Sequence, residues 1–336
     1  MLVPRARTQA DLALDLGSQE IRFASIGGEI RSFPSVIAVR TTRTGLHTAA
    51  TGEAAREMLG RAPEDIRVIR PIRSGLIADY PAAESLLSEL LREVQPSSLR
   101  RPSLLLAVPA DSSEMERRAL QECLRAAGAG KIQLIQSTLA SAVGAELPIE
   151  EPVAHAIIDA GAERTRVAVF SLDGTVAQRS VRIGGESIDG AIAAAVRSER
   201  NLWISRNAAE AVKQRIFGAN VNRIKLRGRD LESGQPKGIL YSQDQALQAT
   251  DDVLTRIEDT VVDVLEATPP ELCGDLLDRG LFLCGGLAPL GPLTQRLQRT
   301  TGLAVLSARE PAQCTVRGLQ KLLSDPSRWG SLIDNS

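Results

Sequence analysis

Aromatic residues and net charge are both scarce in this chain of 336 residues. Aromatic side chains make up 3% of it, too few for the stacking platforms that bind single-stranded nucleic acid. The chain has 40 Lys and Arg against 41 Asp and Glu, so its formal net charge is −1 and no overall positive field attracts nucleic acid or a membrane. The composition therefore predicts that nucleic acid is not a partner.

Residues that ligate metals are also few. The chain has two histidines, and its four cysteines lie far apart without C-x-x-C spacing: Cys123, Cys273, Cys284 and Cys314. A zinc site is therefore not expected, and such cysteines fit a reduced cytosolic compartment. Because no run of about 18 apolar residues exists, we expect no membrane-spanning helix. The apolar stretch within residues 1–10 is too short for a secretory signal.

The chain does contain enough apolar sequence for two domains, or for one large domain of several layers: 43% of its residues are apolar and 24% are charged. Two segments, residues 11–30 and 154–176, have the same pattern. In each, an apolar strand ends in Asp-x-Gly, a short polar turn follows, and an alternating strand runs into a glycine-containing reversal. This repetition predicts a duplicated α/β architecture with a ligand between its halves.

Apolar periodicity and end signals predict the other elements. Ser113 and Glu116 are spaced as a capping box at the start of a helix that ends near Gly128. We expect helices over residues 53–59, 80–95, 112–129, 208–219, 244–267 and 290–300, and strands over residues 104–110, 222–242 (a charged pair) and 280–284.

An Asp-x-Gly turn suits phosphate chemistry. Its carboxylate can hold a hydrated cation, while the following backbone N–H groups and a hydroxyl meet phosphate oxygens. Strand ends also finish in Asp and Gly for turn reasons alone, which is the alternative interpretation. A glycine pair before a helix lets adenine or ribose lie against the backbone. The candidate nucleotide-binding residues in these turns are Asp15, Gly17, Ser18, Asp159, Gly161, Gly285 and Gly286.

Two Asp-x-Gly hairpins followed by strand-Gly-Gly-helix form the pattern of the actin, sugar kinase and heat-shock chaperone superfamily. Within it, the chain resembles the MreB family of bacterial actins over nearly its whole length. The stretches that carry the resemblance are "ALDLGS", "PSVIAV", "TGEAAREMLGRAPEDIRVIRPIRSGLIADY", "VPADSSEMERRALQECLRAAGAGKIQLI", "SVRIGGESIDGAI" and "PPEL". A sugar kinase is not expected, because no substrate-binding insertion with a catalytic Asp is visible, and neither is a chaperone, because no substrate-binding domain follows.

The resemblance implies an actin-like (duplicated ribonuclease-H-like) α/β fold, with two domains that are each split into two subdomains around a nucleotide cleft. It also implies ATP with Mg²⁺ in that cleft and head-to-tail protofilaments under the cytoplasmic membrane. The implied boundaries are residues 1–30, 104–145 and 315–336 for subdomain IA, 31–103 for IB, 146–182 and 250–314 for IIA, and 183–249 for IIB.

The resemblance further places Glu210 and Lys213 near the sugar and base of the nucleotide, with an ordinary solvated helix face as the alternative for both. The metal is expected near Asp15 and Asp159. In the first turn, Glu20 replaces a neutral amide of the family, and its charge repels phosphate unless the side chain turns outward.

Two further departures from the family pattern surround the expected terminal phosphate. Where family members have Glu-Glu-Pro after "IQLI", this chain has Gln-Ser-Thr, so Ser137 holds the position of the Glu that activates the attacking water. A serine cannot replace that base without a partner to take its proton. In the second hairpin the family reads Asp-Ile-Gly-Gly-Gly-Thr-Thr-Glu, and residues 159–166 read Asp-Ala-Gly-Ala-Glu-Arg-Thr-Arg. Two glycines are lost, and Arg164 stands where a hydroxyl belongs. No catalytic residue is therefore predicted.

The altered second turn leaves two interpretations of cofactor binding. Ala162 and Glu163 carry Cβ atoms that oppose the positive φ of a turn that wraps phosphates. Arg164 either contacts phosphates directly, so that ATP binds without Mg²⁺, or pairs with Asp15 or Asp159 in an empty cleft.

We predict an MreB-like cytoskeletal protein that forms or joins protofilaments and has lost nucleotide hydrolysis. The alternative is a non-polymerising pseudo-actin that binds and regulates a true MreB filament. The expected location is the cytoplasm, with peripheral contact at the inner face of the cytoplasmic membrane left open. The segments that would make this contact are residues 1–10 and the loop 96–103, in which Leu99 precedes Arg100 and Arg101. A frayed terminus and a solvated loop are the alternatives.

Overall fold

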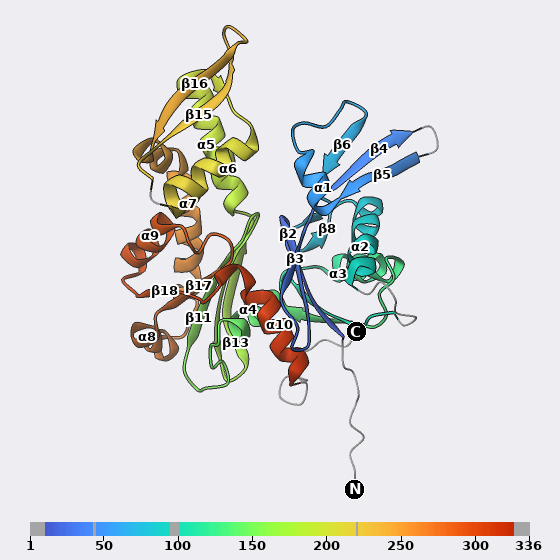
Figure 1. The fold of residues 1–336 in the computed structure, drawn as a ribbon. Coiled ribbons are helices and arrows are strands. Elements are labelled where there is room, and N and C mark those ends of the chain that lie inside the picture. Colours follow the sequence, from blue (N-terminus) through green and yellow to red (C-terminus); the bar gives the residue numbers. More distant parts are fainter. Residues whose placement is uncertain (1–10, 43–44, 95–100, 220, 326–336) are drawn as a thin grey trace. The chain divides into compact units, whose positions relative to one another are not determined.

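The chain folds into two compact units in a computed structural model that describes residues 11–42, 45–94, 101–219 and 221–325 (Figure 1). Unit 1 combines Met1–Glu146 with Gln313–Ser336, and unit 2 is Leu147–Ala312. The expected membrane-contacting segments, residues 1–10 and Leu99 with Arg100, lie outside the described residues. The boundaries of the four subdomains stay a prediction.

Unit 1 is built on a five-stranded sheet of order β10-β9-β1-β2-β3. The antiparallel hairpin β1–β2 is followed by β3, while β9 and β10 run parallel to β1. Its strands are β1 (Leu12–Leu16), β2 (Glu20–Ser25), β3 (Arg31–Pro34), β9 (Leu104–Val108) and β10 (Ile132–Gln136). The helices of unit 1 are α1 (Gly52–Glu57), α2 (Tyr80–Val94), α3 (Glu114–Ala126), α4 (Ser137–Gly144) and α10 (Cys314–Ser324). Its smaller strands are β4 (Ile37–Thr42), β5 (Gly45–Thr51), β6 (Ile66–Ile69), β7 (Ile72–Arg73) and β8 (Leu76–Ile77).

Unit 2 repeats this topology in a sheet of order β13-β12-β11-β17-β18. Again a hairpin, β11–β12, is followed by an antiparallel strand on one side, and two parallel strands lie on the other side. Its strands are β11 (His155–Ala160), β12 (Thr165–Ser171), β13 (Gly174–Val181), β17 (Leu281–Cys284) and β18 (Val305–Ser307). The duplication predicted from the two Asp-x-Gly segments is therefore present in both strand order and direction.

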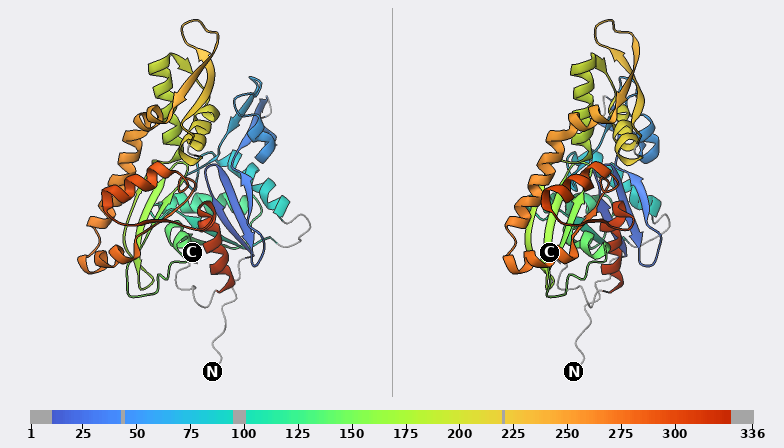
Figure 2. Two further views of the ribbon diagram at one scale, coloured as in Figure 1. Left: turned by 60° about the vertical axis from the view of Figure 1, so that its left-hand side comes forward. Right: turned by 90° about the vertical axis from the view of Figure 1, so that its left-hand side faces the viewer.

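The rest of unit 2 comprises helices and a second, three-stranded sheet of order β14-β15-β16. The strands of that sheet are β14 (Leu202–Trp203), β15 (Arg223–Asp230) and β16 (Pro236–Ser242). The helices are α5 (Gly185–Arg200), α6 (Arg206–Val212), the π-helix η1 (Lys213–Gly218), α7 (Gln243–Glu266), α8 (Pro270–Arg279), α9 (Gly291–Thr301) and the short 3₁₀ turn η2 (Pro311–Gln313). Figure 2 shows α7 running along the unit, with the β15–β16 hairpin near one end and α8 near the other.

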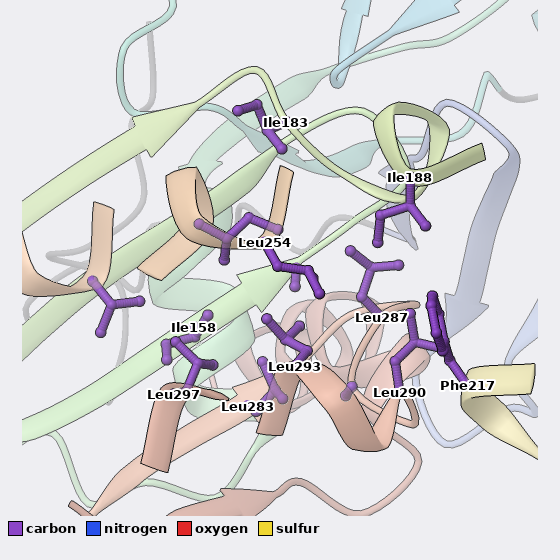
Figure 3. Packing of buried hydrophobic residues seen from close by; sticks show 14 of the residues in the cluster. Ile158, Ile183, Ile188, Phe217, Leu254, Leu283, Leu287, Leu290, Leu293 and Leu297 are labelled. Atoms are coloured by element: carbon purple, nitrogen blue, oxygen red, sulfur yellow. The ribbon is translucent and has the colours of Figure 1, made fainter. Parts of the chain in front are cut away.

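Apolar side chains from sheet and helices form the core of unit 2. Leu293 and Leu297 of α9 lie against Ile158 of β11 and Leu283 of β17, and all four are fully buried (Figure 3). The run of apolar residues in β11 reflects this position, because a central strand of a sheet with helices packed over it is buried throughout.

Each of the six predicted helices is present, with two differences in the one expected at residues 208–219, whereas α4, α5, α8 and α10 were not predicted. The capping box of α3 is present: the Ser113 Oγ accepts a hydrogen bond from the Glu116 N–H at 3.2 Å, and Glu116 Oε2 accepts one from the Ser113 N–H at 2.8 Å. The helix expected at residues 208–219 starts earlier, because the Ser205 Oγ accepts a hydrogen bond from the Ala208 N–H and caps it. It also widens into a π-helix at Lys213.

Helices α4 and α10 of unit 1 cross at a pair of glycines. A Cβ added at Gly144 would collide with the carbonyl group of Cys314, and one added at Gly318 would collide with the carbonyl group of Ala140. Both obstacles are backbone atoms, which cannot rotate away. The close approach of the two helices therefore depends on glycine at both positions.

We expect Gly144→Ala and Gly318→Ala each to lower the free energy of unfolding by about 3 kcal/mol, because the added methyl forces the helices apart. Gly190→Ala is the matched control: this glycine lies in α5 with no atom within 4 Å of the added Cβ, so alanine there should stabilise by about 0.5–1 kcal/mol. Urea titration of the three variants measures both effects. Equal stability of all three would contradict the close helix crossing.

Candidate functional site

In unit 1 the first predicted phosphate turn joins β1 to β2. Asp15 is the fourth residue of β1, and Gly17 has no room for a side chain because a Cβ there would collide with the Glu20 carbonyl oxygen. Ser18 is buried, and its Oγ accepts a hydrogen bond from the Ser74 N–H at 2.8 Å. The turn is thus tight and held in place by a neighbouring loop.

Glu20, the extra carboxylate of this turn, is compensated within unit 1. Its Oε1 lies 2.7 Å from a guanidinium nitrogen of Arg56 on α1, and its side chain is 23% exposed. Burial raises the pKa of Glu20, and the charges of Arg56 and Arg22 oppose that rise. The charge that we expected to repel phosphate has a cationic partner in Arg56, which sequence reasoning missed because α1 lies more than 30 residues away.

The start of α4 lies at the same edge of the unit 1 sheet. β1, β9 and β10 are parallel, so the carboxyl end of β10 at Gln136 and the turn after β1 share that edge. Three polar atoms are buried there without a hydrogen-bond partner among the described residues: Gln136 Oε1, Ser137 Oγ and Thr138 Oγ1. Nor does any side chain cap the helix at Gln136. Buried polar groups normally have hydrogen-bond partners, so three consecutive residues without one indicate a place for a ligand or water.

In unit 2 the second predicted phosphate turn closes without any left-handed residue, since neither Gly161 nor residues 162–165 has a positive φ. The Gly161 N–H donates to the carbonyl of Arg164 at 2.9 Å. The carbonyls of Gly161 and Ala162 accept hydrogen bonds from the N–H groups of Gly185 and Glu186, at 3.0 and 2.7 Å. The turn therefore caps the first turn of α5.

The two arginines of this hairpin have different neighbours. Arg164 is 4% exposed and donates from Nη1 to the Ser180 Oγ on β13 at 2.9 Å. The ion-pair partner of Asp159 is Arg166, directly across on β12, with Nη1 and Oδ2 3.3 Å apart. Arg166 and not Arg164 thus lies opposite Asp159, because the turn length sets a register that brings Arg166 across from the carboxylate. The alternative that Arg164 pairs with Asp15 stays a prediction.

The glycine turn after β17 lies against the same strand end. β17 pairs with β11 so that Cys284 lies beside Asp159. Gly285 has a φ of +86°, and a Cβ there would collide with the Ala160 carbonyl group and lie 2.8 Å from Asp159 Oδ1. Gly286 has open space around it. The structure thus brings Asp159, Gly161, Gly285 and Gly286 to one edge of the unit 2 sheet.

Lys213 belongs to this edge too, but it faces inward. Its Nζ lies 2.9 Å from Asp189 and 3.1 Å from the carbonyl oxygen of Gly185, and the side chains of Lys213 and Asp189 are only 8% and 2% exposed. The solvated alternative is therefore wrong for Lys213. Glu210 is partly exposed and accepts a hydrogen bond from Gln214 at 3.2 Å. Sequence reasoning missed Asp189. The one indication of its burial is that it stands on α5 between Ile188 and Ile192, two apolar residues at helical spacing.

The Asp189–Lys213 pair gives a pH-dependent prediction. Burial raises the pKa of Asp189 to about 6, outweighing the lowering by Lys213. An unfolded Asp titrates near 3.9, so the folded state holds more protons between pH 4 and 6. The contribution of Asp189 to stability should therefore fall as the pH rises through that window. The measurement is the free energy of unfolding of the wild type minus that of Asp189→Asn, across pH 4–7. The exposed Asp252→Asn is the matched control, and a difference that rises with pH would refute this account.

Among the described residues, no group of three or more His, Cys, Asp and Glu side chains could hold a metal ion. No helix in the described part of the chain is both long enough and apolar enough to span a membrane. The assignments of individual residues to nucleotide and metal stay predictions.

Comparison with known proteins agrees with this architecture. A model of the MreB/Mbl protein family matches residues 9–330. The cell shape-determining protein MreB of Escherichia coli K12 is 39% identical over 322 residues, 93% of each chain. The cell shape-determining protein Mbl of Bacillus subtilis is 30% identical over 321 residues, 94% of this chain and 96% of its own.

Solved structures have the same fold. MreB5 of Spiroplasma citri bound to ADP matches with a TM-score of 0.88 and 30% identity, over 96% of this chain and 99% of its own. A MamK double helical filament matches with a TM-score of 0.77 at 18% identity, over 93% and 97% of the two chains, which bears on the fold alone. The predicted actin-like α/β fold is confirmed, and the chain belongs to the MreB/Mbl family of actin-like proteins.

Proposed function

We propose that this MreB-family cytoskeletal protein binds an adenine nucleotide, has lost its hydrolysis, and assembles into protofilaments. The observation that carries the proposal is Ser137 at the head of α4, with a buried hydroxyl that has no hydrogen-bond partner in the described part of the chain. Nucleotide binding is supported by the Spiroplasma citri MreB5, which is 30% identical and has been solved with ADP and with AMPPNP.

The chain offers donors for the phosphates in each unit. In unit 1 these are the hydroxyls of Ser137 and Thr138 and the uncapped N–H groups at the start of α4, where the helix dipole favours an anion. In unit 2 open space surrounds Gly286 of the glycine turn beside β11, whereas the Gly285 N–H already donates to the Pro311 carbonyl. A hydroxyl in place of a carboxylate also removes a negative charge that would repel the terminal phosphate.

The same substitution removes the means of hydrolysis. A general base must accept a proton from the attacking water, and a serine hydroxyl does so only when a neighbouring group takes its own proton. Ser137 Oγ has no such neighbour among the described residues, and the adjacent polar atoms of Gln136 and Thr138 are equally unpaired. Loss of a general base costs roughly 10²- to 10⁴-fold in rate.

We therefore expect purified protein at saturating ATP to release phosphate at close to the rate of a protein-free control. Equilibrium dialysis of ATP against the same sample establishes that the protein binds nucleotide. A family member with Glu at the position of Ser137 is the positive control for the phosphate assay. Turnover equal to that of the positive control would overturn the proposed loss of hydrolysis.

A basic surface at one end of unit 2 supports self-association. The outward residues of β15 are cations, and none forms an ion pair with a described carboxylate: Arg223, Lys225, Arg227 and Arg229. Trp203 and Leu240, which are 56% and 65% exposed, lie on the same face, because Trp203 pairs with Arg229 and Leu240 pairs with Lys225. A partner surface that is both acidic and partly apolar would complement this basic face.

α8 lies near the other end of the unit (Figure 2), and α8 and the end of α7 together expose acidic and apolar side chains. The exposed carboxylates are Asp259, Asp263, Glu266, Glu271 and Asp278, again without a described ion pair. Leu277 among them is 72% exposed. Carboxylates in the last turn of a helix oppose its dipole, so Asp263 and Glu266 cost α7 some stability and are better explained by a partner. Contact between unlike surfaces of successive copies gives an open filament.

Charge reversal tests this contact. Arg223→Glu/Lys225→Glu and Asp263→Lys/Glu266→Lys should each abolish high-speed sedimentation of the otherwise assembling protein, because like charges then meet at every contact. An equimolar mixture of the two variants should sediment again, since each reversed surface meets its complement on the other variant.

Arg197→Glu/Arg299→Glu is the matched control: both are exposed cations of unit 2 outside the two surfaces, and this variant should sediment like the wild type. Recovery in the mixture distinguishes a direct contact from misfolding. A wild type that stays monomeric with nucleotide would instead favour the non-polymerising regulator of another MreB filament.

A further inference from the structure

The first turn of α4 buries two hydroxyl groups at one edge of the unit 1 sheet. Ser137 and Thr138 are 5% and 3% exposed, and neither the Ser137 Oγ nor the Thr138 Oγ1 has a hydrogen-bond partner among the described residues. One turn further along the same helix, the Ser141 Oγ lies 2.9 Å from the Thr315 Oγ1 of α10. The packing of α4 therefore satisfies a buried hydroxyl in its second turn and leaves two without a described partner in its first.

The backbone and the charge of this first turn favour an anion. No described side chain caps α4 at Gln136, and no acidic residue stands in its first turn. The first N–H groups of a helix and the positive end of its dipole therefore have no negative side chain of that turn beside them. Both hydroxyls can donate, and a half-turn about the last torsion of Gln136 exchanges its acceptor Oε1 for the NH₂ donors. Uncharged donors can thus surround an oxyanion here.

The sheet sets the distance between this turn and the first predicted phosphate turn. Leu14 of β1 and Leu134 of β10 are both in register with Leu106 of β9. Leu16 and Gln136 end β1 and β10 two residues further on, so the two strand ends lie level. One strand separates them, which places them about 10 Å apart at the usual spacing of strands. A ligand held at the first turn by one phosphate group therefore reaches α4 only through a chain of phosphates.

We infer that Ser137 and Thr138 bind the terminal phosphate of a nucleoside triphosphate, so that this chain binds ATP more tightly than ADP. Hydrogen bonds to a charged oxygen are stronger than those between neutral groups, and these two hydroxyls give up no described protein partner to form them. The inference rests on the proposed nucleotide binding and deepens it, because it assigns the discrimination between triphosphate and diphosphate to two hydroxyls of unit 1.

The test is calorimetric titration of the full chain with ATP, ADP and AMPPNP at one Mg²⁺ concentration, where AMPPNP is a triphosphate that resists hydrolysis. The wild type should bind both triphosphates at least about tenfold more tightly than ADP. Ser137→Ala/Thr138→Val should weaken triphosphate binding and leave ADP binding unchanged, which brings the three dissociation constants within about threefold of one another. Ser137→Glu should also lose the preference, because its carboxylate repels the terminal phosphate.

Ser141→Ala is the matched control: its hydroxyl is buried in the same helix but has a protein partner, so this variant should keep the preference for triphosphate. Circular dichroism of each variant establishes folding, and Ser137→Ala alone replaces the double variant where the latter does not fold. Equal affinity of the wild type for ATP and ADP, or a preference that the double variant keeps, would overturn this inference and leave the proposed nucleotide binding standing. No binding of any of the three nucleotides would overturn it together with the nucleotide part of the proposed function.

Discussion

A carboxylate buried at a strand end has to be neutralised, and at Asp159 the chain does this with its own Arg166. Much else at this edge of unit 2 accompanies that pairing. The hairpin turn closes without positive φ values, its carbonyls cap α5, and Arg164 lies buried against Ser180 on β13. The protein itself therefore neutralises the Asp159 carboxylate and satisfies the carbonyl groups of the turn that follows it.

The same principle operates at other charged positions near the candidate phosphate turns. Lys213 is matched by Asp189 and by the carbonyl of Gly185, and Glu20 is matched by Arg56. Each pair joins two elements: α5 to η1 in the first case and β2 to α1 in the second. The buried side-chain atoms of Gln136, Ser137 and Thr138 that have no hydrogen-bond partner in the described residues are neutral. Burying a neutral polar group without a hydrogen-bond partner costs much less than burying an unpaired charge. These three side chains therefore do not destabilise unit 1 severely when no ligand is bound.

Sequence reasoning could locate the turns because their signals are local. Asp-x-Gly at two strand ends and Gly-Gly at a third are short patterns, and parallel pairing of β11 with β17 necessarily brings the ends of those strands together. The capping box at Ser113 and Glu116 is equally local. What the sequence could not give were the partners. Arg164 and Arg166 are two residues apart, and only the register of the β11–β12 hairpin decides which one lies opposite Asp159. Asp189 meets Lys213 across a separation of 24 residues that no periodicity reveals.

These pairings change what a nucleotide would do in this chain. In a site built around a metal, hydrolysis and release alter both charge and coordination, and the protein can respond to the difference. Here the charge that neutralises Asp159 is a side chain of the protein, Arg166. Ser137, with a hydroxyl, stands where the family pattern has the general base. With hydrolysis lost as proposed, a bound nucleotide would stay chemically unchanged, and it would stabilise the structure without timing its assembly. Assembly would then be governed by the contacts between copies, and the unpaired cations of β15 together with the carboxylates of α7 and α8 make those contacts electrostatic. Exposed charges of this kind are screened by salt, so the proposed assembly would depend on ionic strength in place of nucleotide hydrolysis.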